Sequence, residues 1–220
     1  MDFHLRYRGP LPANGSPKEK AAIREYLSPQ LEDLFATARQ LKNVNLSWVR
    51  VATSINNGNP QLLPLTSADF ASPIGGAPDR SHSHVFYKFP IGGYTFIPLI
   101  TRLHGLVCEL DLTFLRREDS GAIINAGGDL DNRLKMLFDA LRLPYEQKEI
   151  GRAEPPTAAD IYCLLEDDVL ITRIGLVTGR LLGPLHTDGT AARGTDVELH
   201  LHIHVRVTVG TFANLDFLWK

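Results

Sequence analysis

The chain has 220 residues, of which 44% are hydrophobic and 22% are charged, so it can form one substantial core and intrinsic disorder is not expected. The first twelve residues interrupt every apolar stretch with His or Arg, so we expect no signal peptide, and no other stretch is suited to span a bilayer. The formal net charge of −2 does not favour a nucleic-acid partner unless the 23 Lys and Arg residues gather on one face.

The two cysteines, Cys108 and Cys163, lie in apolar runs typical of strands. They are interpreted as reduced core thiols, which predicts a cytoplasmic location. Neither has the CxxC or His spacing of a zinc finger, so the sequence gives little support for a structural zinc site.

The N-terminal part begins with a strand at residues 3–8, which alternate apolar with polar, followed by a turn rich in Gly and Pro. Ser16, Pro17 and Glu19 form the pattern of a helix N-terminus. Ser28-Pro29 then interrupts the helical pattern, which predicts a second helix running to about Leu41.

The central part, from residue 43 to residue 98, has a mixed pattern, with a strand predicted at Leu46 to Ala52 and a loop-rich stretch that includes Asn56 to Pro60. The C-terminal half returns to alternation. Strands are predicted at 106–115, 161–165, 169–176 and 197–209. The first and last of these have one polar face, so the prediction is an α/β (α+β) fold with a mixed sheet, one face wet and the other covered by helices.

A helix is predicted from about residue 132 to 143, because apolar side chains recur there at helical spacing and Pro144 ends the pattern. Asp129 and Asp131 precede it and would converge only if that segment is extended, since residues two apart lie on nearly opposite sides of a helix. Lys135 lies four residues beyond Asp131, one turn further along the same side. The free N–H groups of this helix start also favour a phosphate.

This constellation suits a hard divalent ion, because Mg²⁺ prefers oxygen ligands and needs few carboxylates. The third acid should come from Glu166-Asp167-Asp168 between two strands, with Asp168 preferred over Asp167 and with Glu109 and Asp111 in reserve. Each element also has an ordinary interpretation. An Asp-x-Asp is usually a turn or helix cap, Lys135 could be a surface ion-pair partner, and three acids in a row often form a solvated turn.

Together, Asp129-Leu130-Asp131-Asn132, Lys135, Asp139-Ala140-Leu141 and Asp167-Asp168 resemble the signature of RusA-like Holliday-junction resolvases. The resemblance covers residues 2–14 and 97–210 of a single domain, 1–220. It implies that Asp129, Asp131 and Asp168 hold Mg²⁺, or Mn²⁺ as a substitute, and that Lys135 contacts the scissile phosphate. Asn132 would support the helix start, Asp167 is a further candidate, and the residues expected to contact DNA are Arg116, Arg117, Arg133 and Lys135.

By this resemblance the chain would be a homodimeric endonuclease that cleaves four-way DNA junctions. Three departures bear on substrate choice: residues 16–96 form a helical and loop-rich insertion relative to the family core, Gly127 and Gly128 stand where basic or aromatic residues are expected, and the connection from Tyr145 to Asp160 is long. The alternatives are a noncatalytic DNA-binding or assembly protein with the same fold, or a related nuclease acting on flaps or single strands.

His200, His202 and His204 lie on one face of the last predicted strand, about 7 Å apart from one to the next. Three ligands in a row along one strand converge poorly on a tetrahedral ion. We therefore interpret them as a polar sheet face, with transition-metal binding as the open alternative.

Overall fold

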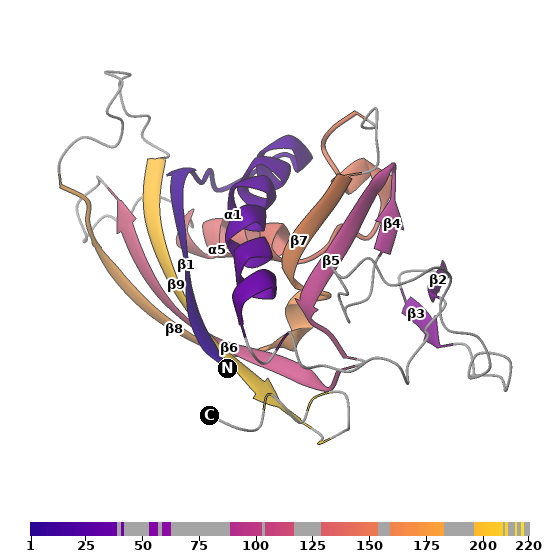
Figure 1. The fold of residues 1–220 in the computed structure, drawn as a ribbon. Helices are drawn as coiled ribbons and strands as arrows, with labels where there is room; N and C mark the ends of the chain where they lie inside the picture. Colours follow the sequence, from indigo (N-terminus) through magenta and orange to yellow (C-terminus); the bar gives the residue numbers. More distant parts are fainter. Residues whose placement is uncertain are drawn as a thin grey trace, which may run out of the picture.

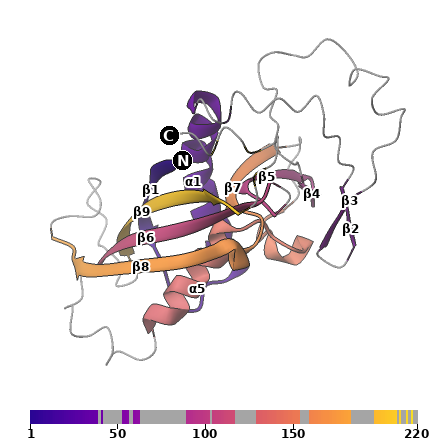
Figure 2. The same cartoon turned by 90° about the horizontal axis from the view of Figure 1, so that it is seen from below.

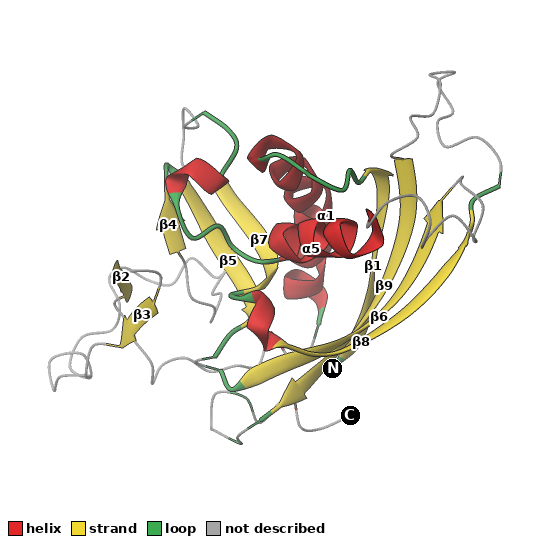
Figure 3. Ribbon diagram, turned by 180° about the vertical axis from the view of Figure 1, so that it is seen from behind, coloured by secondary structure: helices red, strands yellow, loops and turns green. Residues whose placement is uncertain are grey.

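The computed structural model describes residues 1–38, 41, 53–56, 59–62, 89–102, 104–116, 129–153, 159–182, 196–208, 210, 214 and 217, with backbone alone at 53–56, 59–62 and Asp129. Two helices lie between a curved four-stranded sheet and a three-stranded sheet (Figure 1 and, from behind, Figure 3). Both sheets mix parallel and antiparallel pairs, which confirms the predicted α+β class, with the strands divided between separate sheets.

The four-stranded sheet has the order β1-β9-β6-β8, and its strands lie side by side in Figure 2. The bounds are Asp2–Pro10 for β1, Asp196–Val207 for β9, Leu106–Arg116 for β6 and Ile171–Arg180 for β8. β6 alternates strictly between buried and half-buried residues, as its sequence predicts. Its buried side chains join those of β9 in the main core, which leaves the polar side chains on the opposite face.

The three-stranded sheet has the order β4-β5-β7, and a separate hairpin pairs β2 with β3. The bounds are Thr53–Asn56 for β2, Asn59–Leu62 for β3, Phe89–Ile91 for β4, Tyr94–Ile100 for β5 and Ala159–Leu165 for β7. The assignment of Asn56 to Pro60 to a loop is wrong at its ends, because Asn56 pairs with Asn59 and Ile55 with Pro60. The predicted strand at residues 46–52 lies outside the described residues.

Helix α1 spans Pro17–Thr37 and begins with the predicted capping box, in which the Ser16 side chain accepts from the Glu19 amide and the Glu19 carboxylate accepts from the Ser16 amide. The predicted break at Pro29 is wrong, because the helix continues through it. Its apolar stripe contains buried residues on both sides of the proline, at Ile23, Leu27, Leu31 and Phe35. Burial of this continuous stripe offsets the roughly 3 kcal/mol cost of an internal proline.

Helix α5 spans Asp129–Leu141 and therefore begins earlier than expected. The expectation that residues 129–131 are extended is wrong, since these residues form the first turn of the helix. A short helix η1 (Gln147–Glu149) follows, and a second one, η2 (Asp168–Leu170), precedes β8 where the sequence predicted the start of that strand.

The main core lies between the four-stranded sheet and the helices, and a smaller apolar cluster lies under β4, β5 and β7. α1 contributes Ile23, Leu27, Leu31 and Phe35 to the main core, so this part of the predicted 16–96 insertion is integral to the fold. Cys108 and Cys163 are buried free thiols, as predicted, and burial raises the pKa of each to about 12. Within the described residues, no helix combines the length and apolar character needed to cross a membrane.

Candidate active site

Helix α5 presents polar residues to solvent along one side and an apolar stripe to the core on the other. Asp131, Asn132 and Lys135 are exposed. Asp131 and Lys135 are one turn apart on the same side, as their spacing predicts. The stripe that fixes this orientation consists of the buried residues Met136, Leu137, Ala140 and Leu141.

The C-terminal half of α5 is anchored by basic side chains. Arg24, which is 4% exposed, donates from Nε to the Arg142 carbonyl (3.2 Å) and from Nη2 to the Asp139 carbonyl (3.1 Å). These are terminal carbonyls that lack a partner within the helix, and a cation also suits the negative end of the helix dipole. The Asp139 carboxylate pairs with Lys20 of α1 (2.6 Å) and with Arg142 (3.4 Å). Asp139 therefore stabilises the position of α5 through these two ion pairs.

Helix η2 carries the predicted acidic pair at the turn between β7 and β8. Asp167 caps it by accepting from the Val169 amide (3.1 Å). Arg102 donates to the Asp167 carboxylate (2.7 Å), and its backbone amide donates to the buried Glu166 carboxylate (2.9 Å). Asp167 and Glu166 thus fix the turn, which leaves Asp168 as the acid of this group with the fewest structural contacts among those described here.

The two acids of this pair differ in their protonation behaviour. Partial burial, together with the neighbouring Asp167, raises the pKa of Asp168 above its usual value. Partial burial alone would raise the pKa of Asp167 as well, but bonds from the Val169 amide, Asp168 and Tyr145, with the Arg102 charge, hold it below its usual value. The pair therefore shares a proton more readily than two isolated aspartates would, because two adjacent negative charges repel each other.

Arg142 links this pair to α5. Its guanidinium lies 3.8 Å from the ring centre of Tyr145 and donates to the Glu149 carboxylate (3.1 Å). Its charge and that of Asp139 both act on Asp168, in opposite directions. η2 and the C-terminal part of α5 are thus in contact.

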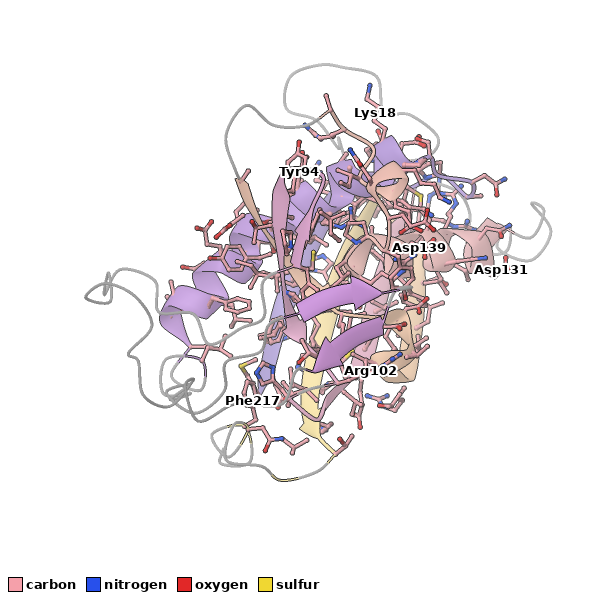
Figure 4. All side chains as sticks on the ribbon, turned by 90° about the vertical axis from the view of Figure 1, so that its right-hand side faces the viewer. Lys18, Tyr94, Arg102, Asp131, Asp139 and Phe217 are labelled. Atoms are coloured by element: carbon pink, nitrogen blue, oxygen red, sulfur yellow. The ribbon has the colours of Figure 1, made fainter. Side chains whose placement is uncertain are left out.

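The same geometry separates Asp131 from this contact. Asp131 and Asp139 are eight residues apart on one helix, which corresponds to about 12 Å along its axis. Figure 4 shows the two at different points of α5, with Asp131 near its outer end. The side chain of Asp129 lies outside the described part of the chain. Among the residues whose side chains are described, Asp131, Asp167 and Asp168 are not found as a group with ligand atoms within 4.8 Å of one another.

The predicted DNA-contacting residues fall into three groups. Lys135 is exposed, so its ammonium group can reach a phosphate. Arg116 and Arg133 are 2% and 5% exposed, which places them inside the fold rather than on a DNA-facing surface. Arg117 lies outside the described residues. Both positions carry a signal in the sequence, because Arg116 continues the two-residue alternation of β6 and Arg133 lies at helical spacing on the apolar stripe of α5.

The polar face of the four-stranded sheet carries a second constellation. Asp111, His202 and His204 have ligand atoms that all lie within 4.8 Å of one another. Asp111 of β6 is the cross-strand partner of His202 of β9. Because α5 packs on the other face of this sheet, neither Asp111 nor Glu109 can serve as the reserve third acid of the α5 site.

The chain was compared with models of protein families, with curated proteins and with solved structures, and none of the three comparisons found a match.

Proposed function

We propose that the chain is a Mg²⁺-dependent, structure-selective DNA endonuclease that acts on branched DNA, of the kind its RusA-like signature implies. The observation that carries the proposal is the contact between η2, with Asp167 and Asp168, and α5, which bears Asp131 and Lys135. These segments are separated by about 30 residues of sequence. They lie next to each other at the C-terminal part of α5, near Asp139 and Arg142.

The donor set around Asp168 fits a hard divalent cation. The groups are carboxylates, they are partly accessible, and the pKa of Asp168 is raised by burial and by Asp167. A divalent cation next to the pair would offset this repulsion and favour both ionised forms. Asp168, Asp131 and Asp129 are the residues we assign to Mg²⁺ or Mn²⁺, which supplies charge stabilisation at the phosphate and an activated water. Coordination of one ion by both Asp131 and Asp168 requires them to lie closer than they do here, because Asp131 is about 12 Å along α5 from the part that contacts η2.

The remaining residues bind and orient. Lys135 lies on the exposed side of α5, where it can pair with a DNA phosphate. Its ammonium group sits on a flexible side chain, which suits a contact with the DNA backbone. Arg102 and Tyr145 restrain Asp167, so that its neighbour Asp168 is presented at a fixed turn. Arg142 and Lys20 pair with Asp139, and Arg102 pairs with Asp167, so no such ion pair is described for Asp168.

The test is cleavage of a synthetic four-way DNA junction by the full chain in Mg²⁺ or in EDTA. We expect nicking in Mg²⁺ alone, and a loss of about 100-fold or more in Asp131→Asn and in Asp168→Asn. Asp33→Asn, an exposed aspartate on α1, is the matched control and should cleave at the wild-type rate. Circular dichroism would show whether each variant is folded. Wild-type cleavage by both folded site variants would refute the proposed centre.

The same assay distinguishes the alternatives. Junction binding without nicking would favour a noncatalytic DNA-binding or assembly protein. The net charge of −2 and the burial of Arg116 and Arg133 count against DNA binding of either kind, so absence of junction binding would argue against both alternatives. Preference for flaps or single strands in a substrate panel would favour a related nuclease. Opposed nicks in one junction need two active sites, so we also propose a homodimer, which light scattering of the protein with and without junction DNA would test. A cytoplasmic location is proposed from the two reduced cysteines.

A further inference from the structure

The polar face of the four-stranded sheet carries three imidazoles in close packing. His4 of β1 stacks on His202 of β9 with ring centres 4.1 Å apart, and His202 and His204 have ring centres 4.0 Å apart. The strand register sets this arrangement, since His4 and Asp111 flank His202 on its two sides. A row of ligand-type side chains therefore crosses three strands, and not only one as the β9 sequence alone suggests.

Asp111 closes this group from β6. Its Oδ2 atom lies 3.2 Å from Nε2 of His204. Two ligands of one tetrahedral ion, each about 2.0–2.1 Å from it, are about 3.4 Å apart, so this spacing suits a shared metal as well as a hydrogen bond. Convergence across two strands removes the objection that ligands along a single strand diverge.

The surroundings of the three side chains resemble those of a built metal site. Nδ1 of His204 lies 3.2 Å from the Asp2 carboxylate, so a carboxylate can orient the ring while Nε2 serves as the ligand. Arg173 holds Asp111 from the other side through both carboxylate oxygens, at 3.0 and 2.8 Å. Asp111 also lies directly over Gly175, where a Cβ atom would come within 2.2 Å of Oδ1. The glycine thus leaves the space that the carboxylate occupies.

The charge balance permits a cation here. The carboxylates of Asp2, Glu109 and Asp111 face two guanidinium groups, those of Arg173 and Arg206.

We propose that Asp111, His202 and His204 form a binding site for a first-row transition-metal ion of the Zn²⁺ class, separate from the proposed Mg²⁺ centre and on the opposite face of the sheet. Two imidazoles and one carboxylate suit Zn²⁺ or Co²⁺ rather than Mg²⁺. Three protein ligands leave a fourth position for water or for an external ligand. The site goes beyond the nuclease proposal and does not depend on it.

The test uses the purified full chain, freed of metal, with Zn²⁺ titrated by calorimetry and Co²⁺ by visible absorption. We expect one ion per chain at this site and the intense spectrum of four-coordinate Co²⁺. Affinity should fall at least tenfold in His204→Asn and in Asp111→Asn. His200→Asn is the matched control, because His200 lies on the same face of the same strand but pairs with Glu198 (3.1 Å).

Two outcomes would overturn the proposal: no saturable Zn²⁺ binding, or wild-type affinity in folded His204→Asn and Asp111→Asn. An equal loss in His200→Asn would do the same, since it would show a diffuse histidine surface. Asp168→Asn should leave Zn²⁺ binding intact. This variant keeps failure of the nuclease proposal distinguishable from failure of the zinc site.

Discussion

Replacement of Arg24 by methionine tests whether α5 is held in place by the buried guanidinium. The substitution keeps an unbranched apolar stem but removes the guanidinium and its bonds to the Arg142 and Asp139 carbonyls. The bond to the Arg142 carbonyl is buried, so loss of its donor should cost about 2 kcal/mol. The bond to the Asp139 carbonyl is partly buried, so its loss should cost about 1 kcal/mol. The expected loss in the free energy of unfolding is thus about 3 kcal/mol.

For a chain of this size a loss of 3 kcal/mol lowers the Tm by roughly 6–12 °C, which calorimetry can measure. Arg152→Met is the control, because Arg152 forms an exposed ion pair with Glu25 that should contribute less than about 1 kcal/mol. Junction cleavage should also fall in Arg24→Met at a temperature where the protein remains folded, since α5 carries Asp131 and Lys135. A Tm change no larger than that of Arg152→Met would refute the anchoring role.

Three further substitutions or conditions test the fold itself. Ser16→Ala removes the side-chain half of the capping box and should cost about 1 kcal/mol in urea unfolding, whereas an unchanged midpoint would argue against the cap. Pro29→Ala should raise the free energy of unfolding by about 1–3 kcal/mol, because it restores an amide donor for the Glu25 carbonyl within a continuous helix, and a decrease would contradict this. Burial lowers the pKa of His104 to about 4, so only the unfolded chain takes up this proton between pH 6.5 and 4. Stability should therefore fall by roughly 3 kcal/mol as the pH drops through that window, and a His104→Gln variant with the same pH dependence would exclude this cause.

The elements best predicted from the sequence are those whose pattern repeats along the chain. β6 and β9 alternate over eleven and twelve residues, and their burial follows the alternation closely. The N-terminus of α1 was equally predictable, because a capping box is a local interaction. These signals need no knowledge of what packs against the element.

The predictions of secondary structure that were wrong concern segments in which long-range packing overrides a local sequence signal. Pro29 is a helix breaker by its own chemistry, yet the apolar stripe of α1 is buried on both sides of it. Asp129 to Asp131 follow two glycines and suit an extended segment, but the backbone is already helical there. The local sequence indicates how much free energy a residue costs in a helix or strand. It does not indicate how much apolar surface that element buries in the fold, which can offset the cost.

The candidate sites show the same division. The order of acidic motifs predicts that Asp131 and Asp168 converge, but η2 contacts the C-terminal part of α5 instead. The burial of Arg116 and Arg133 follows the periodicity of β6 and α5, which the family resemblance does not take into account. The alignment of Asp111 with His202 depends on strand order and register. A one-residue shift in that register would move Asp111 away from the histidine, so the sequence of β9 alone does not reveal the site.

The most direct measurement of the nuclease proposal is the position of the metal. Crystals of the full chain with junction DNA, grown in Mn²⁺, would give an anomalous-difference map. We expect a peak within bonding distance of the Asp168 carboxylate, about 2.2 Å, that is also coordinated by Asp129 or Asp131 of α5. A map with no Mn²⁺ at Asp168, or with Asp131 still one or more helical turns away from it in the DNA complex, would contradict the proposed active site.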